Sequence, residues 1–270
     1  MTMTSTLDNN FPALLKTWRQ SRGISQLELA LRCDSSQKHI SFLESGRSRP
    51  SRTMVYIVSE ALEVPLRDRN ELLLAAGFAP GYRESAPTDE VLSTVNSALE
   101  QLLKGNEPFP AMVFDRFHTV LQANMGAMKL QMFLFGVDRL EDLPDISANL
   151  MRGLLHPDGY RDHIRNWNDV ASVMLRRLQA EANAAGNPPE ALAILDECAS
   201  YPGVPENWRQ LVAQDWQKPL LTVDMAKDGV ELSFMTTMTT LGTPFDITLQ
   251  EIRLESFFPA DDATRLFFMQ

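Results

Sequence analysis

Four polar residues precede a short apolar pattern, at Ser36, Gln37, Lys38 and His39. The apolar residues behind them, Ile40 and Leu43, lie three positions apart and predict a helix whose exposed first turn carries the polar side chains. A glutamine can form two hydrogen bonds with an adenine edge, and a lysine can reach guanine acceptors or a phosphate. These residue types at a helix tip therefore predict contact with DNA bases.

Three arginines follow closely, in the sequence "GRSRPSR" of residues 46–52. Arg47, Arg49 and Arg52 suit contact with phosphates or insertion into a narrow minor groove. The competing interpretation of the polar turn is a solvated helix face without a partner. The arginines, and the capping signal and short turn that precede the tip, favour the DNA interpretation.

Another helix is predicted immediately before this tip. Ser25 and Glu28 form a capping box, in which the hydroxyl and the carboxylate are expected to satisfy free backbone donors. Gln26 lies at the start of this helix, where backbone amides and the helix dipole favour a phosphate. The residues expected to face the core are Leu27, Ala30 and Leu31.

The connection between these two helices is short. Cys33 and Asp34 must form a sharp turn, and Asp34 tolerates a left-handed backbone better than most residues do. Five helices are predicted before residue 80. Two helices joined in this way are typical of a helix-turn-helix, whose second helix lies in the major groove of DNA.

A stretch rich in Pro, Gly and Ser near residues 80–88 predicts a domain boundary. The predicted parts are a DNA-binding domain over 1–82, a linker and connecting helix over 83–106, and a ligand-binding domain over 107–270. The connecting helix is expected to begin at Thr88–Asp89 and to end at Gly105. Its apolar stripe fits either a cover for the core or a seam between two copies of the chain.

The rest of the chain predicts an α+β domain. Two short strands, "AMVFD" and "TVLQAN", come before a helical section over about 125–215. Three more strands follow, "LLTVDM", "VELSFMTTMTTL" and "FDITLQEIRLESFF", and a slip in apolar phase between Leu249 and Ile252 predicts a bulge. Five antiparallel strands with helices inserted after the second give a sheet with one covered face, which is similar to a PAS fold.

Methionines are concentrated in this second part, which holds 10 of the 13. Flexible thioethers suit an adaptable apolar pocket, although methionines at helical or strand spacing also fit an ordinary core. Threonines on one strand face fit bonding across the sheet equally well, and Asn124 can cap the helix that follows it. The candidate ligand contacts are Asn124, Met128, Met132, Asn166, Trp167, Met174, Phe234, Thr236 and Met238.

The chain has a formal net charge of -10, but the charge is unevenly distributed. Residues 1–85 hold 11 of the 25 Lys and Arg and 9 of the 35 Asp and Glu, so the front is mildly basic and the remainder strongly acidic. That asymmetry allows a local nucleic-acid surface. No signal peptide or membrane-spanning run is visible, and Cys33 and Cys198 form no CxxC pair, so we expect a cytoplasmic protein without membrane contact.

Evidence for an enzyme is weak. His156, Asp158 and His163 lie close in sequence, but no third ligand completes a zinc site, and we expect neither a metal nor a cofactor. His156 precedes Pro157 and is expected to cap a helix or to bond backbone. No nucleophile elbow, P-loop or dinucleotide fingerprint is present, so we expect no catalytic site.

The front of the chain resembles the Xre-type repressors, the class of the lambda-phage repressor. "SQLELA" and "SSQKHISFLESGRSRPS" match that class in order and spacing. The resemblance implies that Gln26 contacts a phosphate and that Gln37 and Lys38 read bases. It also implies a structural pair between Arg19 and Glu44 that fixes the recognition helix. Asp34 departs from the class, in which glycine is more frequent.

Over roughly residues 14–268 the chain resembles the MmyB-like transcription regulators, through "LLAAGFAPGY", "LLHPDGYRDHIRNW" and "ELSFMTTMTTLGTPFDITLQEIRLESFFPADDAT". The resemblance implies an Xre helix-turn-helix joined to a PAS-like domain that holds a small, largely apolar, fatty-acid-like ligand. We expect a homodimer on a palindromic operator in double-stranded DNA. The alternative is an interaction module at a promoter, whose second domain recruits a protein partner without any ligand.

Overall fold

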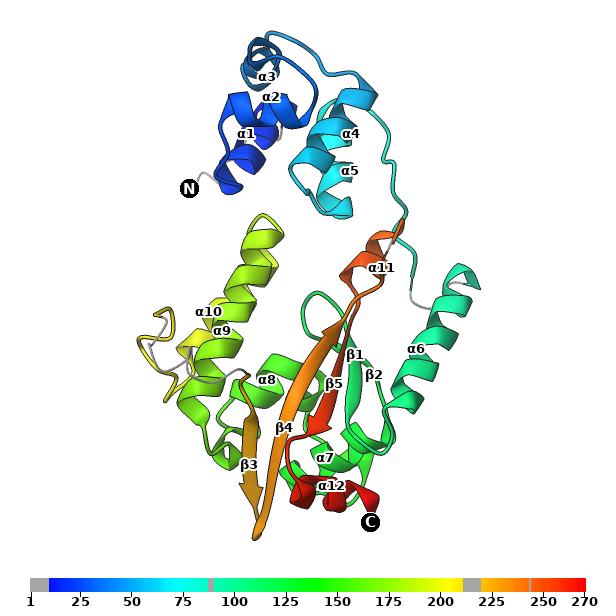
Figure 1. The fold of residues 1–270 in the computed structure, drawn as a ribbon, viewed down its shortest axis with the longest axis vertical. Helices are drawn as coiled ribbons and strands as arrows, with labels where there is room; N and C mark the ends of the chain where they lie inside the picture. The colour runs from blue at the N-terminus through cyan, green and yellow to red at the C-terminus, as the bar shows by residue number, and fades with distance from the viewer. Residues whose placement is uncertain (1–9, 87–89, 211–219, 243) are drawn as a thin grey trace, which may run out of the picture. The chain divides into compact units, whose positions relative to one another are not determined.

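The computed structural model describes residues 10–86, 90–210, 220–242 and 244–270. The chain forms two compact units (Figure 1). Unit 1 comprises the chain up to Ser85 with two short later segments, 183–186 and 244–250, and unit 2 comprises the rest. The start expected for the connecting helix, Thr88–Asp89, lies outside the described residues.

Unit 1 contains the five predicted helices, and their order is confirmed. They are α1 (Phe11–Ser21), α2 (Gln26–Arg32), α3 (Gln37–Glu44), α4 (Arg52–Ala61) and α5 (Leu66–Ala75). A side-chain oxygen caps each of the first four by accepting a hydrogen bond from the backbone N–H three residues later. The four capping residues are Asn10, Ser25, Ser36 and Ser51. Ile40 and Leu43 are fully buried, as their spacing predicts.

Helix α2 corrects two expectations. Leu29 and Ala30 face the core, whereas Leu27 and Leu31 are 52% and 69% exposed. Residues two positions apart differ by about 200° around a helix, so a buried Leu29 turns both of these leucines outward. The Glu28 carboxylate bonds Arg32 at 3.0 Å and not the start of the helix, so only the Ser25 half of the capping box forms.

The turn between α2 and α3 has the predicted form. Asp34 has a φ of 48°, in the left-handed region, and its place in the turn is confirmed. Ser35 N–H then donates to the Ala30 carbonyl at 2.9 Å, which closes the turn without glycine.

Unit 2 is built on a five-stranded antiparallel sheet with the order β2-β1-β5-β4-β3 (Figure 1). Its strands are β1 (Ala111–Phe114), β2 (Val120–Ala123), β3 (Val223–Lys227), β4 (Val230–Thr239) and β5 (Arg253–Pro259). The predicted hairpin, helical insert and three-stranded meander are confirmed. The last strand, β5, closes the sheet by pairing with both β1 and β4.

The segment predicted as one long last strand contains a helix. Helix α11 (Ile247–Glu251) precedes β5, and Asp246 starts it by accepting a hydrogen bond from the Thr248 N–H at 2.9 Å. The bulge predicted between Leu249 and Ile252 is therefore wrong. The slip in apolar phase marks the change from helical to strand periodicity.

Helices surround the sheet. They are α6 (Ser93–Gly105), α7 (Met125–Phe135), α8 (Leu150–Leu155), α9 (Trp167–Ala184), α10 (Pro189–Ser200) and α12 (Asp262–Met269), with short 3-10 turns at Glu90–Leu92, Leu140–Asp142, Asp145–Ala148 and Arg161–His163. Helices α6 and α7 both pack against β1, and α12 packs against β4 and β5. One face of the sheet contributes Met112, Phe114, Phe234 and Phe257 to the main core with α7, α8 and α9.

Candidate functional sites

The tip of α3 is the first candidate site. Ser36 caps the helix by accepting from the His39 N–H at 3.1 Å, and the Gln37 and Lys38 side chains are exposed. His39 is half-buried, with Nδ1 3.1 Å from the Ser35 hydroxyl. The fold thus leaves the Gln37 amide and the Lys38 ammonium available to a partner.

The three arginines beyond α3 are also exposed. Arg47 and Lys38 both lie over the Phe42 ring, at 5.8 and 5.5 Å from its centre, and Arg52 lies over the Tyr56 ring at 5.8 Å. Phe42 therefore gathers two cations beside the tip of the helix. Arg49 is exposed in the loop before α4. The DNA contacts of these residues stay predictions.

The Arg19 cluster, made of Arg19, Gln26 and Glu44, fixes α3 from behind. Arg19 donates through Nε and Nη2 to the two Glu44 oxygens at 2.6 and 3.0 Å, and Gln26 donates to Glu44 at 2.8 Å. The expected pair is therefore present, with side chains only 11% and 4% exposed. Burial alone would raise the pKa of Glu44, but the bonds from Arg19 and Gln26 outweigh it and lower that pKa.

The second candidate site is a cavity of about 40 Å³ in unit 2. Most of its lining is apolar and comes from α7, α8 and the inner face of the sheet. The lining residues are Met112, Ala127, Leu130, Gln131, Leu134, Leu150, Leu154, Tyr160, Met174, Val223, Met225, Thr236, Glu255 and Phe257. Four of them carry polar groups at the cavity: Gln131, Tyr160, Thr236 and Glu255.

Two of the nine candidate ligand contacts, Met174 and Thr236, line this cavity. Three others bond backbone elsewhere. The Asn124 carboxamide caps α7 and bonds the Ala111 N–H and the Phe109 carbonyl. The Asn166 carboxamide bonds the Thr222 carbonyl and the Asp224 N–H. Trp167 Nε1 donates to the Gly203 carbonyl at 2.8 Å. These three side chains therefore hold the fold together.

The other four candidates also lie outside the cavity lining. Phe234 is fully buried and meets the rings of Phe257 and Phe268 edge-on. Met128 and Met132 are half-buried on α7. Met238 is 38% exposed, and its sulfur accepts from Arg177 at 3.5 Å.

Sequence reasoning missed Glu255, Gln131 and Tyr160. A signal existed for Glu255, because it is a charged residue inside the apolar strand "RLESFF". Residues two apart in a strand share a face, so the Glu255 side chain is expected on the same face of the sheet as Phe257. No comparable signal marks Gln131 or Tyr160, which are polar groups inside helical or turn segments.

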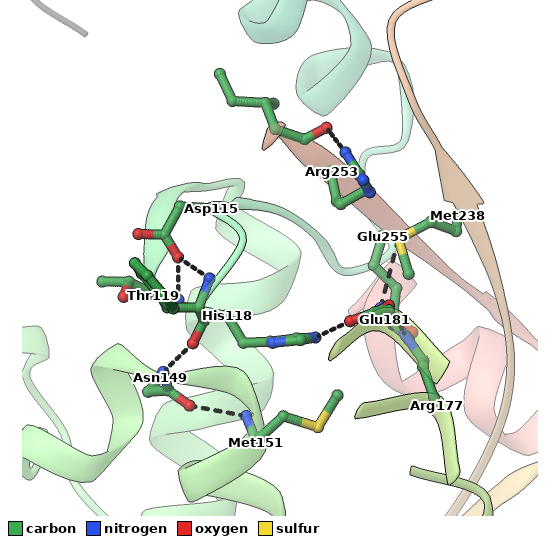
Figure 2. A network of polar contacts seen from close by, with 12 residues as sticks. Asp115, His118, Thr119, Asn149, Met151, Arg177, Glu181, Met238, Arg253 and Glu255 are labelled. Carbon is green, nitrogen blue, oxygen red and sulfur yellow. Dashed lines mark hydrogen bonds and ion pairs between the residues drawn. The ribbon is translucent and has the colours of Figure 1, made fainter. Parts of the chain in front are cut away.

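Glu255 also belongs to a network of polar contacts, which Figure 2 shows. The Arg177 cluster consists of His118, Arg177, Glu181 and Glu255. Arg177 Nε lies 3.0 Å from Glu181, and its Nη1 lies 3.4 Å from Glu255. His118 Nε2 is 3.2 Å from Glu181, an ion-pair distance without hydrogen-bond alignment. Burial raises the pKa of Glu181, but His118 and Arg177 outweigh that effect and bring the pKa to about 2.

The histidine segment that sequence analysis set aside bonds backbone. His156 Nδ1 accepts from the Asp158 N–H at 3.0 Å, which confirms the local role predicted for it. Over the described ranges, no group of three or more His, Cys, Asp or Glu could hold a metal ion. Among the helices in these ranges, none has both the length and the apolar character needed to cross a membrane.

Comparison with known protein families accounts for both units. Residues 15–68 match a helix-turn-helix family, and residues 95–268 match the ligand-binding domain of MmyB-like transcription regulators. A comparison with curated proteins gave no significant match. The second family match covers well over half of the chain. The chain therefore belongs to the MmyB-like transcription regulators, DNA-binding regulators that carry a ligand-binding domain.

Proposed function

We propose that this regulator binds a palindromic operator as a homodimer and that a small, largely apolar ligand with a fatty-acid-like chain modulates this binding. The observation that carries the DNA part is the exposed pair Gln37 and Lys38 on a helix held from behind by the Arg19 cluster. A fixed helix with free polar groups at its N-terminal end suits readout in the major groove.

The apolar lining of the cavity supports the ligand part of the proposal. Its volume of about 40 Å³ is far below the several hundred Å³ that ligand pockets usually have, so the cavity must widen to accept a ligand. Met112, Met174 and Met225 line it, and unbranched thioether side chains rearrange at low cost. Ligand can change DNA affinity only by favouring one arrangement of the DNA-binding units over another.

The small volume of the cavity also fits a second candidate function. In this alternative the chain is an interaction module that recruits a protein partner and holds no ligand. Native mass spectrometry of the purified full chain separates the two. A co-purifying small molecule supports the ligand-responsive regulator. Protein that stays free of ligand and binds none of a panel of apolar molecules supports the interaction module.

The DNA part is tested by two matched substitutions in α3 and α4. Gln37→Ala should cost about 1–3 kcal/mol of discrimination at one base pair, because it removes a base contact. Arg52→Ala should lower the affinity for all DNA sequences alike and reduce the dependence of that affinity on salt, because it removes a phosphate contact. Binding titrations on an operator and on scrambled DNA measure both effects. Equal loss of discrimination in the two variants would refute this division of roles.

The operator itself comes from selecting genomic fragments with the purified protein. A homodimer on a palindrome requires two half-sites whose centres lie about 34 Å apart, one turn of DNA. Single, unpaired sites among the selected fragments would contradict the dimer.

A further inference from the structure

The lining of the cavity in unit 2 is apolar except at a few positions, and one of these carries a negative charge. Among the described residues that line it, Glu255 is the one that carries a charged side chain. Glu255 is only 3% exposed, although it lies on the central strand β5 of the sheet. A buried carboxylate facing an apolar cavity is costly unless other groups compensate its charge. Its partners therefore decide what the cavity can accept.

Arg177 compensates Glu255 only in part. Its guanidinium is 3.4 Å from Glu255 but 3.0 Å from Glu181, so two carboxylates share one arginine (Figure 2). Its guanidinium also contacts the Met238 sulfur at 3.5 Å, a weak acceptor, and lies 5.8 Å from the centre of the Phe114 ring. Within the group of Arg177, Glu181 and Glu255, negative charge exceeds positive charge by one. A second anion beside Glu255 would increase this imbalance in a medium of low dielectric constant.

A hydroxyl lies next to Glu255 on the same face of the sheet. Thr236 pairs with Phe257 and Met238 pairs with Glu255, so Thr236 and Glu255 are diagonal neighbours across β4 and β5. Both line the cavity. They offer an acceptor and a second hydrogen-bonding group side by side at an otherwise apolar wall.

The remaining polar groups of the lining are less available. The Tyr160 hydroxyl and the Gln131 side chain hydrogen-bond each other, and burial raises the pKa of Tyr160 to about 12. The phenol is therefore neutral near pH 7, and none of the described lining residues is a cation that would hold a carboxylate.

We propose that the polar end of the ligand is a hydrogen-bond donor without negative charge, a hydroxyl or an ammonium group, which donates to Glu255 beside Thr236. The ligand then resembles a fatty acid in its hydrocarbon chain but lacks the carboxylate. This inference rests on the proposed ligand-binding function of unit 2. It assigns Glu255 as the residue that selects among apolar ligands by their polar end.

The test compares octanol, octylamine and octanoate, which share one chain and differ in the polar end. Isothermal titration of the full-length protein near pH 7 should show octanol or octylamine binding on the order of tenfold more tightly than octanoate. The relative affinities of octanol and octylamine identify which donor is preferred. Tighter binding of octanoate would overturn the inference and leave the proposed ligand binding intact. Failure of all three to bind would count against the ligand-binding function itself.

Substitutions test whether Glu255 causes the preference for octanol or octylamine over octanoate. Glu255→Gln should reduce the preference over octanoate to within about threefold, because an amide no longer repels an anion. Glu231→Gln, on the same sheet at an exposed position of β4, is the matched control and should leave the preference unchanged. Should Glu255→Gln fail to fold, Thr236→Val should still weaken octanol binding severalfold. An unchanged preference in a folded Glu255→Gln protein, or unchanged octanol affinity in Thr236→Val, would overturn the assignment.

Discussion

Two arginine-centred clusters, one in each unit, use similar residues to opposite effect. In the Arg19 cluster one guanidinium meets one carboxylate through two bonds, at 2.6 and 3.0 Å, and an amide completes the set. In the Arg177 cluster one guanidinium is divided between two carboxylates at 3.0 and 3.4 Å. In the first cluster the one guanidinium and the one carboxylate balance each other in charge. The second is unbalanced and adjoins a cavity.

The difference shows how geometry separates a fixed element from an adaptable one. Two parallel bonds between arginine and a carboxylate hold both planes in place, so the Arg19 cluster sets the angle of α3. Longer single contacts to several acceptors leave Arg177 free to exchange partners at low cost. Recognition of an operator needs the first property, and acceptance of a ligand into a small cavity needs the second.

The largest effect should come from removing the carboxylate of the balanced cluster. Glu44→Ala leaves Arg19 buried without its counter-charge and should destabilise α1 to α3 by about 3–5 kcal/mol. Native-state hydrogen exchange of the backbone amides in these helices measures this locally. Operator affinity should fall together with amide protection. Unchanged protection in Glu44→Ala would show that packing alone positions α3.

A smaller effect is expected in the unbalanced cluster. Arg177→Met keeps the length of the side chain but removes the guanidinium that Glu181 and Glu255 share. Because Arg177 is 20% exposed and water can replace part of its bonding, we expect a loss of about 1–3 kcal/mol. Chemical denaturation followed by far-UV circular dichroism measures this loss. Adding Glu255→Gln to Arg177→Met should restore part of it, and a further loss would contradict the charge imbalance.

The two clusters also differ in how far sequence predicts them. The caps at Ser25 and Ser36 were predictable because short local motifs mark them, and the Arg19–Glu44 pair was predictable only through the resemblance to the Xre-type repressors. The Arg177–Glu255 contact joins residues 78 positions apart on α9 and β5, and no local pattern links them. Only tertiary packing brings them together, so the cavity and its charge could not be read from the chain.

Errors in the sequence-based prediction have the same origin. Asn124 and Asn166 are polar residues beside apolar segments, and such residues bind a ligand or satisfy backbone groups depending on which atoms the fold brings near. Helix α11 was missed because a five-residue helix leaves too little periodicity to separate it from the strand that follows. The order of helices and strands was predictable because longer segments repeat their pattern several times.

Low pH should reduce the contribution of the Arg177 cluster to the stability of the fold. The pKa of Glu181 is about 2 in the folded chain, below about 4.3 in the unfolded chain, so its charge stabilises the fold above pH 4 to 5. This contribution is lost as pH falls toward 2. In Glu181→Gln the thermal midpoint should therefore fall less steeply between pH 5 and pH 2 than in the wild type. The Glu231→Gln control should keep the wild-type slope, and a wild-type slope in Glu181→Gln would contradict the lowered pKa.

The smallest effect is expected at the Glu28–Arg32 pair, which sets a lower limit for the comparison. Its two side chains are 47% and 45% exposed and lie one helical turn apart at 3.0 Å. Glu28→Gln should cost only about 0.3–0.5 kcal/mol, because water and salt already screen an exposed pair. Hydrogen exchange in α2 measures the change, and added salt should reduce it further. A loss near that of Glu44→Ala would contradict the small contribution expected of an exposed ion pair.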